Sequence, residues 1–407
     1  MMTLLLALFV GSAHAGVLET WGGGEIGSAG NAGVATSDAH SAWYNPAALD
    51  AENFDATTEI VYGNAEFSVS PAKGKTVEPY SANSRGVLLG VGLNNYWLGL
   101  PRSNFGLSLF LPAKGPFSWY DPEDALKDEP ASATLPRWSS ELSRLDAAVG
   151  GNYWLTDHFA IGAGVDISAT FVTLTFIEID DFYDLDDPDA ARKGQDVTIT
   201  PTFHPTVGMV AIAGDPDGAH ARIGLLGKTA RWMDDSGTGY VKLFSGGENL
   251  IFQHHYYRYY APPTLTLGVN VRPVESLSVR AESSYGAWSR AHGPFYEDLS
   301  KDWSNTVTAR LGAKVSVDRV RILGGYAYDP SPVRTIPRNT LIVDGPSHSL
   351  TAGLGAVVRT MDERNLTAMI GMRSQRFAST TIEAKGAGNP EFEGGLLGFR
   401  AGLGWGR

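Results

Sequence analysis

The sequence has no cysteine and little positive charge. Without cysteine among its 407 residues, the chain has neither a disulfide scaffold nor a thiolate metal site. Its 32 Lys and Arg residues are outnumbered by 44 Asp and Glu, which gives a net charge of −12. No basic stripe is therefore available to neutralise the phosphates of a nucleic acid. We expect no nucleic-acid partner, no metal and no cofactor.

Long apolar runs are also missing. No stretch of about 18 uncharged apolar residues follows the first fifteen residues, which excludes a helical membrane span. A chain of this kind can cross a membrane only as a closed barrel, because lipid offers no partner to open backbone groups. The 48 glycines, the 11% of aromatic residues and the low charged content of 19% favour an all-β membrane protein over a cytosolic enzyme.

The first fifteen residues are predicted to be a secretory signal. Thr3 to Val10 is a short apolar run, and Ala13 and Ala15 supply small residues at the positions that a signal peptidase reads. No Lys or Arg precedes the run, so we expect either a start further upstream or an atypical leader. The alternative is a buried N-terminal segment.

Several segments alternate between apolar residues and small or polar ones. The pattern is strict in 159–171, 277–285, 307–316 and 366–373, and it predicts β-strands with two unlike faces. In a membrane barrel the apolar face meets lipid, where a cation costs roughly 2–4 kcal/mol at the midplane. The cations of these segments all share the other parity: Arg280, Arg310, Lys314 and Arg373.

The lengths of the connections separate a membrane barrel from a soluble sandwich. Six short turns alternate with seven long loops, as in outer-membrane barrels with long external loops and short periplasmic turns. This predicts an antiparallel barrel of about fourteen strands with both ends on the short-turn side. The predicted strands are 56–70, 84–98, 103–113, 139–156, 158–175, 197–213, 219–233, 262–272, 277–290, 303–316, 319–329, 347–359, 365–378 and 394–407.

Aromatic residues gather near the predicted strand ends. They predict two girdles at the membrane surfaces, although each residue alone could equally belong to a core. The short-turn girdle would hold Trp97, Tyr153 and Trp154, and the other would hold Tyr285, Trp288, Trp303, Tyr326 and Tyr328.

Residues 16–55 do not alternate and are rich in Gly, Ala and Ser. A phosphate-binding loop is excluded, because no Lys-Ser or Lys-Thr pair follows the glycines and no strand precedes them. We expect a compact plug in the barrel lumen, where glycines allow close approach of backbones. Lumen-facing glycines of the wall would leave room for it, namely Gly90, Gly92, Gly162, Gly164 and Gly312.

Three motifs in the right order give the chain a resemblance to a known family. The Gly/Ala-rich stretch 27–49 contains Asn45-Pro46-Ala47, and strands within 263–289 end in Trp288-Ser289. The late motif comprises Tyr328, Asp329, Ser331, Pro332 and Val333. Together they resemble the long-chain fatty acid outer-membrane transporter family of the FadL/TodX type, over nearly the whole mature chain.

The resemblance implies a signal peptide at 1–15, an N-terminal hatch at 16–55 and a barrel at 56–407. It further implies passive uptake of long-chain fatty acids or other small hydrophobic compounds across the outer membrane of a Gram-negative bacterium. The expected partners are such a ligand, membrane lipid and lipopolysaccharide, and the chain is expected to be monomeric and not an enzyme. The C-terminal Arg407 replaces the aromatic residue with which many such barrels end.

Two other functions stay open: a non-transporting hatch-bearing barrel that docks a surface or periplasmic protein, and a membrane esterase. No Gly-x-Ser-x-Gly or His-Glu-x-x-His motif supports catalysis. Lumen cations are candidates to bind a ligand carboxylate, although they could instead pair with Glu282 or the hatch. These candidates are Arg222, Lys228, Arg280, Arg310 and Lys314.

Two loops carry weaker signals. The acidic run 180–189 could bind calcium, but it lacks the pattern of an EF-hand and is better explained as a solvated loop. His254-His255 lies among four tyrosines, which suggests either a greasy landing surface or girdle residues. Adjacent histidines point apart on a strand, so no zinc site is expected there.

Overall fold

The computed structural model describes most of the chain that the sequence assigns to the hatch and the barrel. The described residues are 22–50, 54–70, 77–112, 145–179, 191–215, 218–242, 249–290, 300–336, 345–361, 364–381, 383–384 and 391–406. The predicted signal at 1–15 and the acidic run 180–189 lie outside them.

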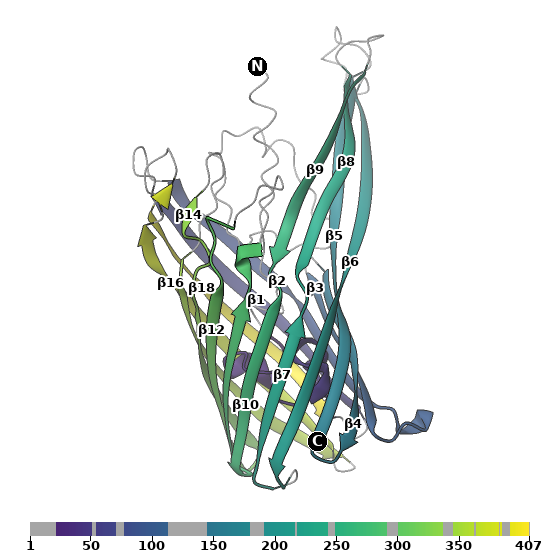
Figure 1. Cartoon of the computed structure of the whole chain (residues 1–407), viewed down its shortest axis with the longest axis vertical. Coiled ribbons are helices and arrows are strands. Elements are labelled where there is room, and N and C mark those ends of the chain that lie inside the picture. Colours follow the sequence, from purple (N-terminus) through teal and green to yellow (C-terminus); the bar gives the residue numbers. More distant parts are fainter. Residues whose placement is uncertain are drawn as a thin grey trace.

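Fourteen antiparallel strands close into a barrel (Figure 1). Strands that follow one another along the wall are paired, and β1 (Phe54–Ser70) closes the ring against β18 (Glu391–Gly406). The predicted strand number is confirmed. The other wall strands are β2 (Val77–Asn94), β3 (Ser103–Pro112), β4 (Leu145–Thr156), β5 (Phe159–Ile179), β6 (Ala191–Gly214), β7 (His220–Lys228), β10 (Thr264–Val274), β11 (Leu277–Gly286), β12 (Thr306–Val317), β13 (Val320–Asp329), β15 (Ser347–Met361) and β16 (Arg364–Thr381).

The six connections predicted to be short turns all lie at the end of the barrel where β1 begins and β18 ends. The first predicted long loop is shorter than expected, because β2 begins at Val77 and leaves only 71–76 between β1 and β2. The region 234–261, which we expected to be a loop, instead forms most of the hairpin β8 (Arg231–Lys242) and β9 (Asn249–Ala261). Its many aromatic and β-branched residues favour this extended pairing. In Figure 1, β8 and β9, together with β5 and β6, rise beyond the other strands at the end opposite the C-terminus. A short parallel pair joins β14 (Thr335–Ile336) to β17 (Glu383–Ala384).

The outer face of the barrel is apolar. Ile60, Leu311 and Ile370 are 65%, 54% and 58% exposed, and they alternate along their strands with inward residues. So much exposed apolar surface on a closed sheet is the arrangement of a transmembrane barrel, in which this face meets lipid. Arg280 and Arg373 are buried in the interior, which confirms the predicted parity of the cations. None of the helices in the described part of the chain has the length and apolar character of a membrane span.

Residues 22–50, here called the N-terminal segment, lie inside the ring of strands (Figure 1). The segment contains two short α-helices, α2 (Gly24–Ser28) and α3 (Ser41–Tyr44), and the 3-10 helix η2 (Pro46–Ala48). Its apolar side chains are almost wholly buried. Ala47 and Ala48 form a cluster with Val210 and Ile212 of β6. The lumen is therefore filled by packed side chains at this level.

Glycines of the wall let the segment approach closely at three of the predicted positions, Gly90, Gly162 and Gly312, whereas Gly164 faces the Val149 carbonyl of the wall. A Cβ on Gly162 would overlap the backbone nitrogen of Ala47, and one on Gly312 would overlap the carbonyl oxygen of Ala29. No larger residue fits at either place without moving the segment. Gly224 and Gly325 face backbone atoms of the segment in the same way, whereas Gly90, Gly208 and Gly353 face its side chains.

The predicted girdles are only partly correct. Tyr153 and Tyr285 are 47% and 45% exposed on the outer face, as expected. Trp154 instead packs inside against the apolar cluster of the N-terminal segment, because it has the lumen parity of β4. Trp288 and Trp303 are buried and lie 5.5 Å apart between ring centroids. They follow or precede regular strands, where alternation no longer decides which way a side chain points.

Candidate functional site

The motif Asn45-Pro46-Ala47 lies in the lumen and shapes the turn between α3 and η2. The side-chain oxygen of Asn45 accepts a hydrogen bond from the Ala47 N–H (3.1 Å), which caps η2, while Pro46 occupies its first turn. The Asn45 amide also donates to the Val34 carbonyl at 2.7 Å. Asn45 thereby ties the two halves of the N-terminal segment together.

Neutral amides attach this end of the segment to the wall. The side-chain amide of Asn152 on β4 donates to the carbonyls of Ala47 (3.0 Å) and Leu49 (2.5 Å). Asn104 on β3 also donates to Leu49, at 3.2 Å. All of these groups are buried, so each bond replaces one that water would otherwise make.

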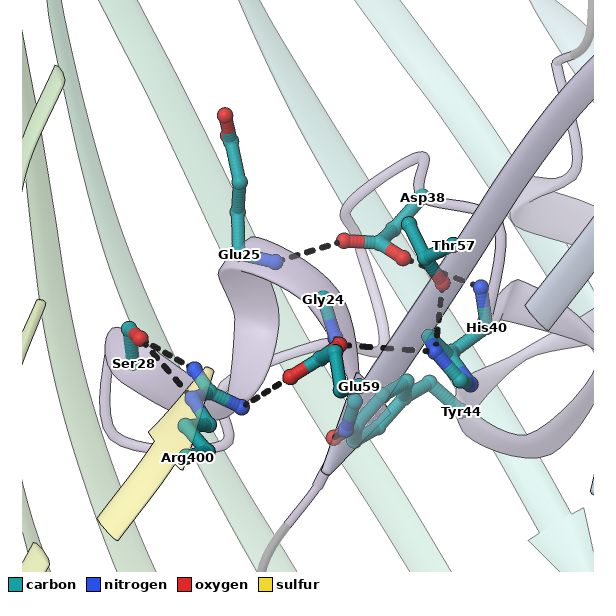
Figure 2. A network of polar contacts seen from close by, with 10 residues as sticks. Gly24, Glu25, Ser28, Asp38, His40, Tyr44, Thr57, Glu59 and Arg400 are labelled. Atoms are coloured by element: carbon teal, nitrogen blue, oxygen red, sulfur yellow. Dashed lines mark hydrogen bonds and ion pairs between the residues drawn. The ribbon is translucent and has the colours of Figure 1, made fainter. Parts of the chain in front are cut away.

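A buried charged cluster attaches the other end, at the seam where β1 meets β18 (Figure 2). Glu59 of β1 accepts the Gly24 N–H and lies 3.5 Å from the Arg400 guanidinium of β18. Arg400 in turn donates to the Ser28 hydroxyl. Glu59 is 2% exposed and Arg400 8%, so each charge depends on the other for compensation.

His40, the N-cap residue of α3, completes this cluster. Its Nε2 lies 2.8 Å from the Thr57 hydroxyl and 3.7 Å from Glu59 (Figure 2). Burial lowers the pKa of His40 to about 4, with Glu59 opposing the shift and Arg400 adding to it. The imidazole is therefore neutral at pH 7. Apart from the lumen parity of Glu59 and Arg400, no pattern in the sequence indicates this cluster.

Four of the five candidate cations are engaged in ion pairs. Two of them lie on β7 and contact the N-terminal segment. Arg222 pairs with Asp50 at 2.8 Å. Lys228 pairs with Asp166 at 3.0 Å and lies over the Trp43 ring, 3.9 Å from its centroid. Both bind the N-terminal segment, which is the alternative that the sequence had left open.

The next two candidates are also paired. Arg310 contacts Glu282 at 3.0 Å and Asp329 at 3.6 Å, and Glu282 itself accepts two backbone N–H groups of the segment. Lys314 contacts Glu25 at 2.9 Å.

Glu25 of the segment forms ion pairs with two cations of the wall. Arg321 binds its second oxygen at 2.6 Å, while Lys314 binds the first. Burial raises the pKa of Glu25, but Lys314, Arg321 and Arg280 outweigh that effect and hold the pKa at about 2. Glu25 is thus charged at any physiological pH. Arg280, the fifth candidate, makes no ion pair with any of the described residues.

The late motif has a structural setting at the far end of β13. Asp329 contacts Arg310, and the Ser331 hydroxyl accepts the Val333 N–H at 3.2 Å. The Pro332 carbonyl accepts the Ser304 N–H at 2.8 Å, and Val333 forms a β-bridge with Trp303. Tyr328 lies against His348, with ring centroids 5.0 Å apart. The motif therefore closes the end of β13 onto the residues before β12.

A cavity of about 1160 Å³ lies on the short-turn side of the N-terminal segment. Turn residues such as Arg102 and Asp157 form its rim, and Glu25 and Asp38 of the segment border it. Three of the candidate cations line it: Arg222, Arg280 and Lys314. Within the described ranges no group of three or more His, Asp or Glu residues is placed to hold a metal ion.

No protein-family model matches the sequence, and no curated protein does. Solved structures do match. A Pseudomonas aeruginosa FadL homologue gives a TM-score of 0.57 at 16% identity, covering 93% of this chain and 95% of the other. The P. putida toluene transporter TodX gives 0.54 at 13% identity, covering 98% and 99%. The Ralstonia pickettii toluene transporter TbuX gives 0.51 at 15% identity, covering 94% and 99%. The chain therefore has the fold of the FadL- and TodX-type barrels, which confirms the resemblance seen in the sequence at the level of the fold.

Proposed function

We propose that this chain is a channel of the Gram-negative outer membrane for passive uptake of small hydrophobic compounds, long-chain fatty acids among them. The shared fold supports this, because the solved structures include proteins described as toluene transporters. The proposed partners are the ligand, membrane lipid and lipopolysaccharide, and the proposed state is a monomer. Fold alone does not fix function, so the proposal rests on the lumen.

The observation that carries the proposal is the blocked lumen. The N-terminal segment fills the barrel beside a cavity of about 1160 Å³, and separate sets of bonds attach its two ends. We assign residues 16–55 as the hatch, 56–407 as the barrel and 1–15 as the signal peptide. Displacing so short a segment opens a path without breaking any backbone hydrogen bond of the wall. A wall of closed strands keeps its shape while this happens.

Uptake by cells tests the function. The chain is expressed in a Gram-negative host that lacks its own fatty acid transporter, and entry of labelled oleate and toluene is measured against empty vector. We expect faster entry of at least one of them. If neither oleate nor toluene, nor any other long-chain acid or aromatic hydrocarbon, enters faster, the transport proposal is wrong.

A disulfide lock tests the hatch. A Cβ on Gly371 of β16 would lie 2.8 Å from both the Ser28 Oγ of the segment and the Arg400 Nε, so a cysteine there can reach position 28 once the Arg400 side chain moves aside. Because the chain has no cysteine, the double variant Ser28→Cys with Gly371→Cys forms only this bond. We expect oxidation to stop uptake and dithiothreitol to restore it.

The single variant Ser28→Cys is the matched control, because it loses the same hydroxyl but cannot form the bond. Its uptake should not respond to oxidation. If the oxidised double variant, with its disulfide verified by mass spectrometry, transports as fast as its reduced form, the segment does not have to move and the hatch assignment fails.

A further inference from the structure

One wall of the cavity is basic. Five strands that neighbour one another in the barrel, β7, β10, β11, β12 and β13, each contribute one inward cation to it. In strand order these are Arg222, Arg272, Arg280, Lys314 and Arg321. Asn270 of β10 pairs in register with Arg222 on one side and with Arg280 on the other. The three side chains therefore form one rung of the wall.

The N-terminal segment faces this wall with three carboxylates, and two of them are already engaged with other cations. Glu25 binds Lys314 at 2.9 Å and Arg321 at 2.6 Å. Asp50 binds Arg222 at 2.8 Å. Each of these contacts compensates the charge of its cation within the protein.

The third carboxylate, Asp38, is engaged with backbone groups. One of its oxygens accepts the Glu25 N–H at 3.0 Å and the other accepts the His40 N–H at 2.9 Å (Figure 2). Both oxygens thus point back into the segment. Asp38 acts on Arg280 only through its field, not through a contact.

Arg280 has no partner at contact distance in the part of the chain that the structure describes. It is 3% exposed, and its Nε and Nη1 donate to none of the described residues. An arginine is always charged and carries five N–H donors, so burying it without an acceptor is costly. For stability alone, an apolar side chain at this position would be better than an unpaired arginine. The guanidinium is explained if it binds an anion.

Asn270 presents a second donor beside it. Its side-chain oxygen accepts the Ser278 hydroxyl at 2.7 Å, which leaves the NH₂ group of the amide to donate. Asn270, Ser278 and Arg280 all line the cavity. A guanidinium and an amide NH₂ side by side on one rung match the two oxygens of a carboxylate.

We propose that Arg280 and Asn270 form a carboxylate-binding site in the cavity, on the short-turn side of the N-terminal segment. The inference rests on the proposed function: the site holds the head group of an amphiphilic acid after it has passed the segment. It gives the channel a station for fatty acids that a neutral hydrocarbon cannot use. The site binds the ionised form of the acid, and no covalent bond forms or breaks.

Binding to the full-length chain in nanodiscs tests the site, with octanoate, octan-1-ol and acetate as probes in titration calorimetry. Protein-free nanodiscs correct for partition into lipid. We expect Arg280→Met to weaken octanoate binding by about 10- to 100-fold, which is the usual worth of a charged hydrogen bond. Octanol binding should not change.

Arg102→Met is the matched control. Arg102 lines the rim of the same cavity and the substitution removes the same charge, but its side chain is 50% exposed and already faces Asp157 at 3.4 Å. Its octanoate affinity should stay within twofold of that of the unchanged chain. Equal octanoate affinity in Arg280→Met and the unchanged chain overturns the site. Equal losses in both variants also overturn it, because they show a diffuse charge effect.

Acetate distinguishes the source of the anion. If acetate binds much more weakly than octanoate, the apolar tail contributes to binding, which supports an amphiphilic acid as the ligand. If acetate binds as tightly as octanoate and also loses affinity in Arg280→Met, the site binds small periplasmic anions, and the proposal of a fatty acid site is overturned.

A stability readout separates binding from a structural role. Because Arg280 is buried without a partner, Arg280→Met should unfold at the same or a higher temperature in a heat-modifiability gel, while losing octanoate. A clear drop in that temperature would mean that Arg280 holds the lumen together, and would overturn the proposal.

Uptake separates the failure of the site from the failure of the proposed function. Arg280→Met should slow the uptake of oleate and leave the uptake of toluene unchanged. If the unchanged chain transports neither, the proposed function fails, whereas the octanoate titration still judges the site.

Discussion

The buried pair of Glu59 and Arg400 gives the sharpest prediction about how the N-terminal segment is held. Glu59→Gln keeps the shape of the side chain and still offers an oxygen to the Gly24 N–H. It removes the charge that compensates Arg400, which lies 3.5 Å away and is only 8% exposed. The Ser28 hydroxyl, its remaining partner, is neutral. Arg400 is then a buried cation without a counter-charge.

The expected cost follows from burial. Breaking a buried ion pair by removing one partner costs about 3–5 kcal/mol. The lower end applies here, because the hydrogen bonds to Gly24 and Ser28 survive. At about 1.4 kcal/mol for each factor of ten, a loss of about 3 kcal/mol raises the open population of the segment roughly a hundredfold.

Hydrogen exchange by mass spectrometry in nanodiscs measures this. Amides of residues 22–50 should exchange roughly a hundredfold faster in Glu59→Gln, because exchange reports local opening. The double variant Glu59→Gln with Arg400→Gln removes both charges, and its exchange should return to within about tenfold of the original rate. The reasoning is refuted if the segment exchanges no faster in the single variant. Equal acceleration in β1 and β18 would also refute it, because the pair would then hold the seam of the barrel and not the segment.

Three further predictions concern the same segment. Since the pKa of His40 is lowered to about 4 from 6.5, the released segment takes up a proton first as the pH falls through 6.5. Attachment should therefore weaken between pH 6.5 and 4, seen as faster exchange of residues 22–50, and His40→Asn should flatten this dependence. Gly312→Val should weaken attachment of the segment by about 1–3 kcal/mol and expose it to protease, because the added side chain overlaps the segment. Gly355→Val should not, because its side chain meets only ordinary contacts at 3.5 Å and beyond. Equal cleavage of both would contradict the close approach. Asn152→Leu removes the amide that donates to the Ala47 carbonyl and leaves the Leu49 carbonyl with Asn104 alone, which should weaken attachment of the segment by about 1–3 kcal/mol. The temperature at which the segment becomes protease-sensitive should therefore fall, and an unchanged temperature would show that these bonds do not hold it.

The wall of the barrel could be predicted from the sequence because its rules are local. Alternation places Leu311 outside and Arg310 inside whatever the neighbouring strands do, since successive side chains point to opposite faces. Errors begin where a strand ends. Trp288 was expected in a girdle, but it follows β11 in the short helix η4 (Trp288–Arg290) and is buried.

The hairpin β8–β9 shows the same limit on a larger scale. Its residues favour strands, yet its alternation does not reveal that it pairs with itself outside the barrel. The predicted turns lie at the correct end of the barrel, but loop length could not show which predicted loops contain strand residues: β2 begins at Val77, and β8 and β9 lie largely within a predicted loop.

By itself, therefore, the sequence determined a closed barrel of fourteen strands, its apolar exterior, its inward cations and a glycine-rich stretch to fill it. Only the tertiary structure decided which inward charges meet. Arg400 and Ser28 are 372 positions apart, and their contact exists because closing the ring brings β18 beside β1 above a segment that reaches the lumen from the other end of the chain. The same closure satisfies Arg222, Lys228, Arg310 and Lys314, and leaves Arg280 without a partner among the described residues. Parity is a property of one strand, whereas charge compensation is a property of all that surrounds the lumen.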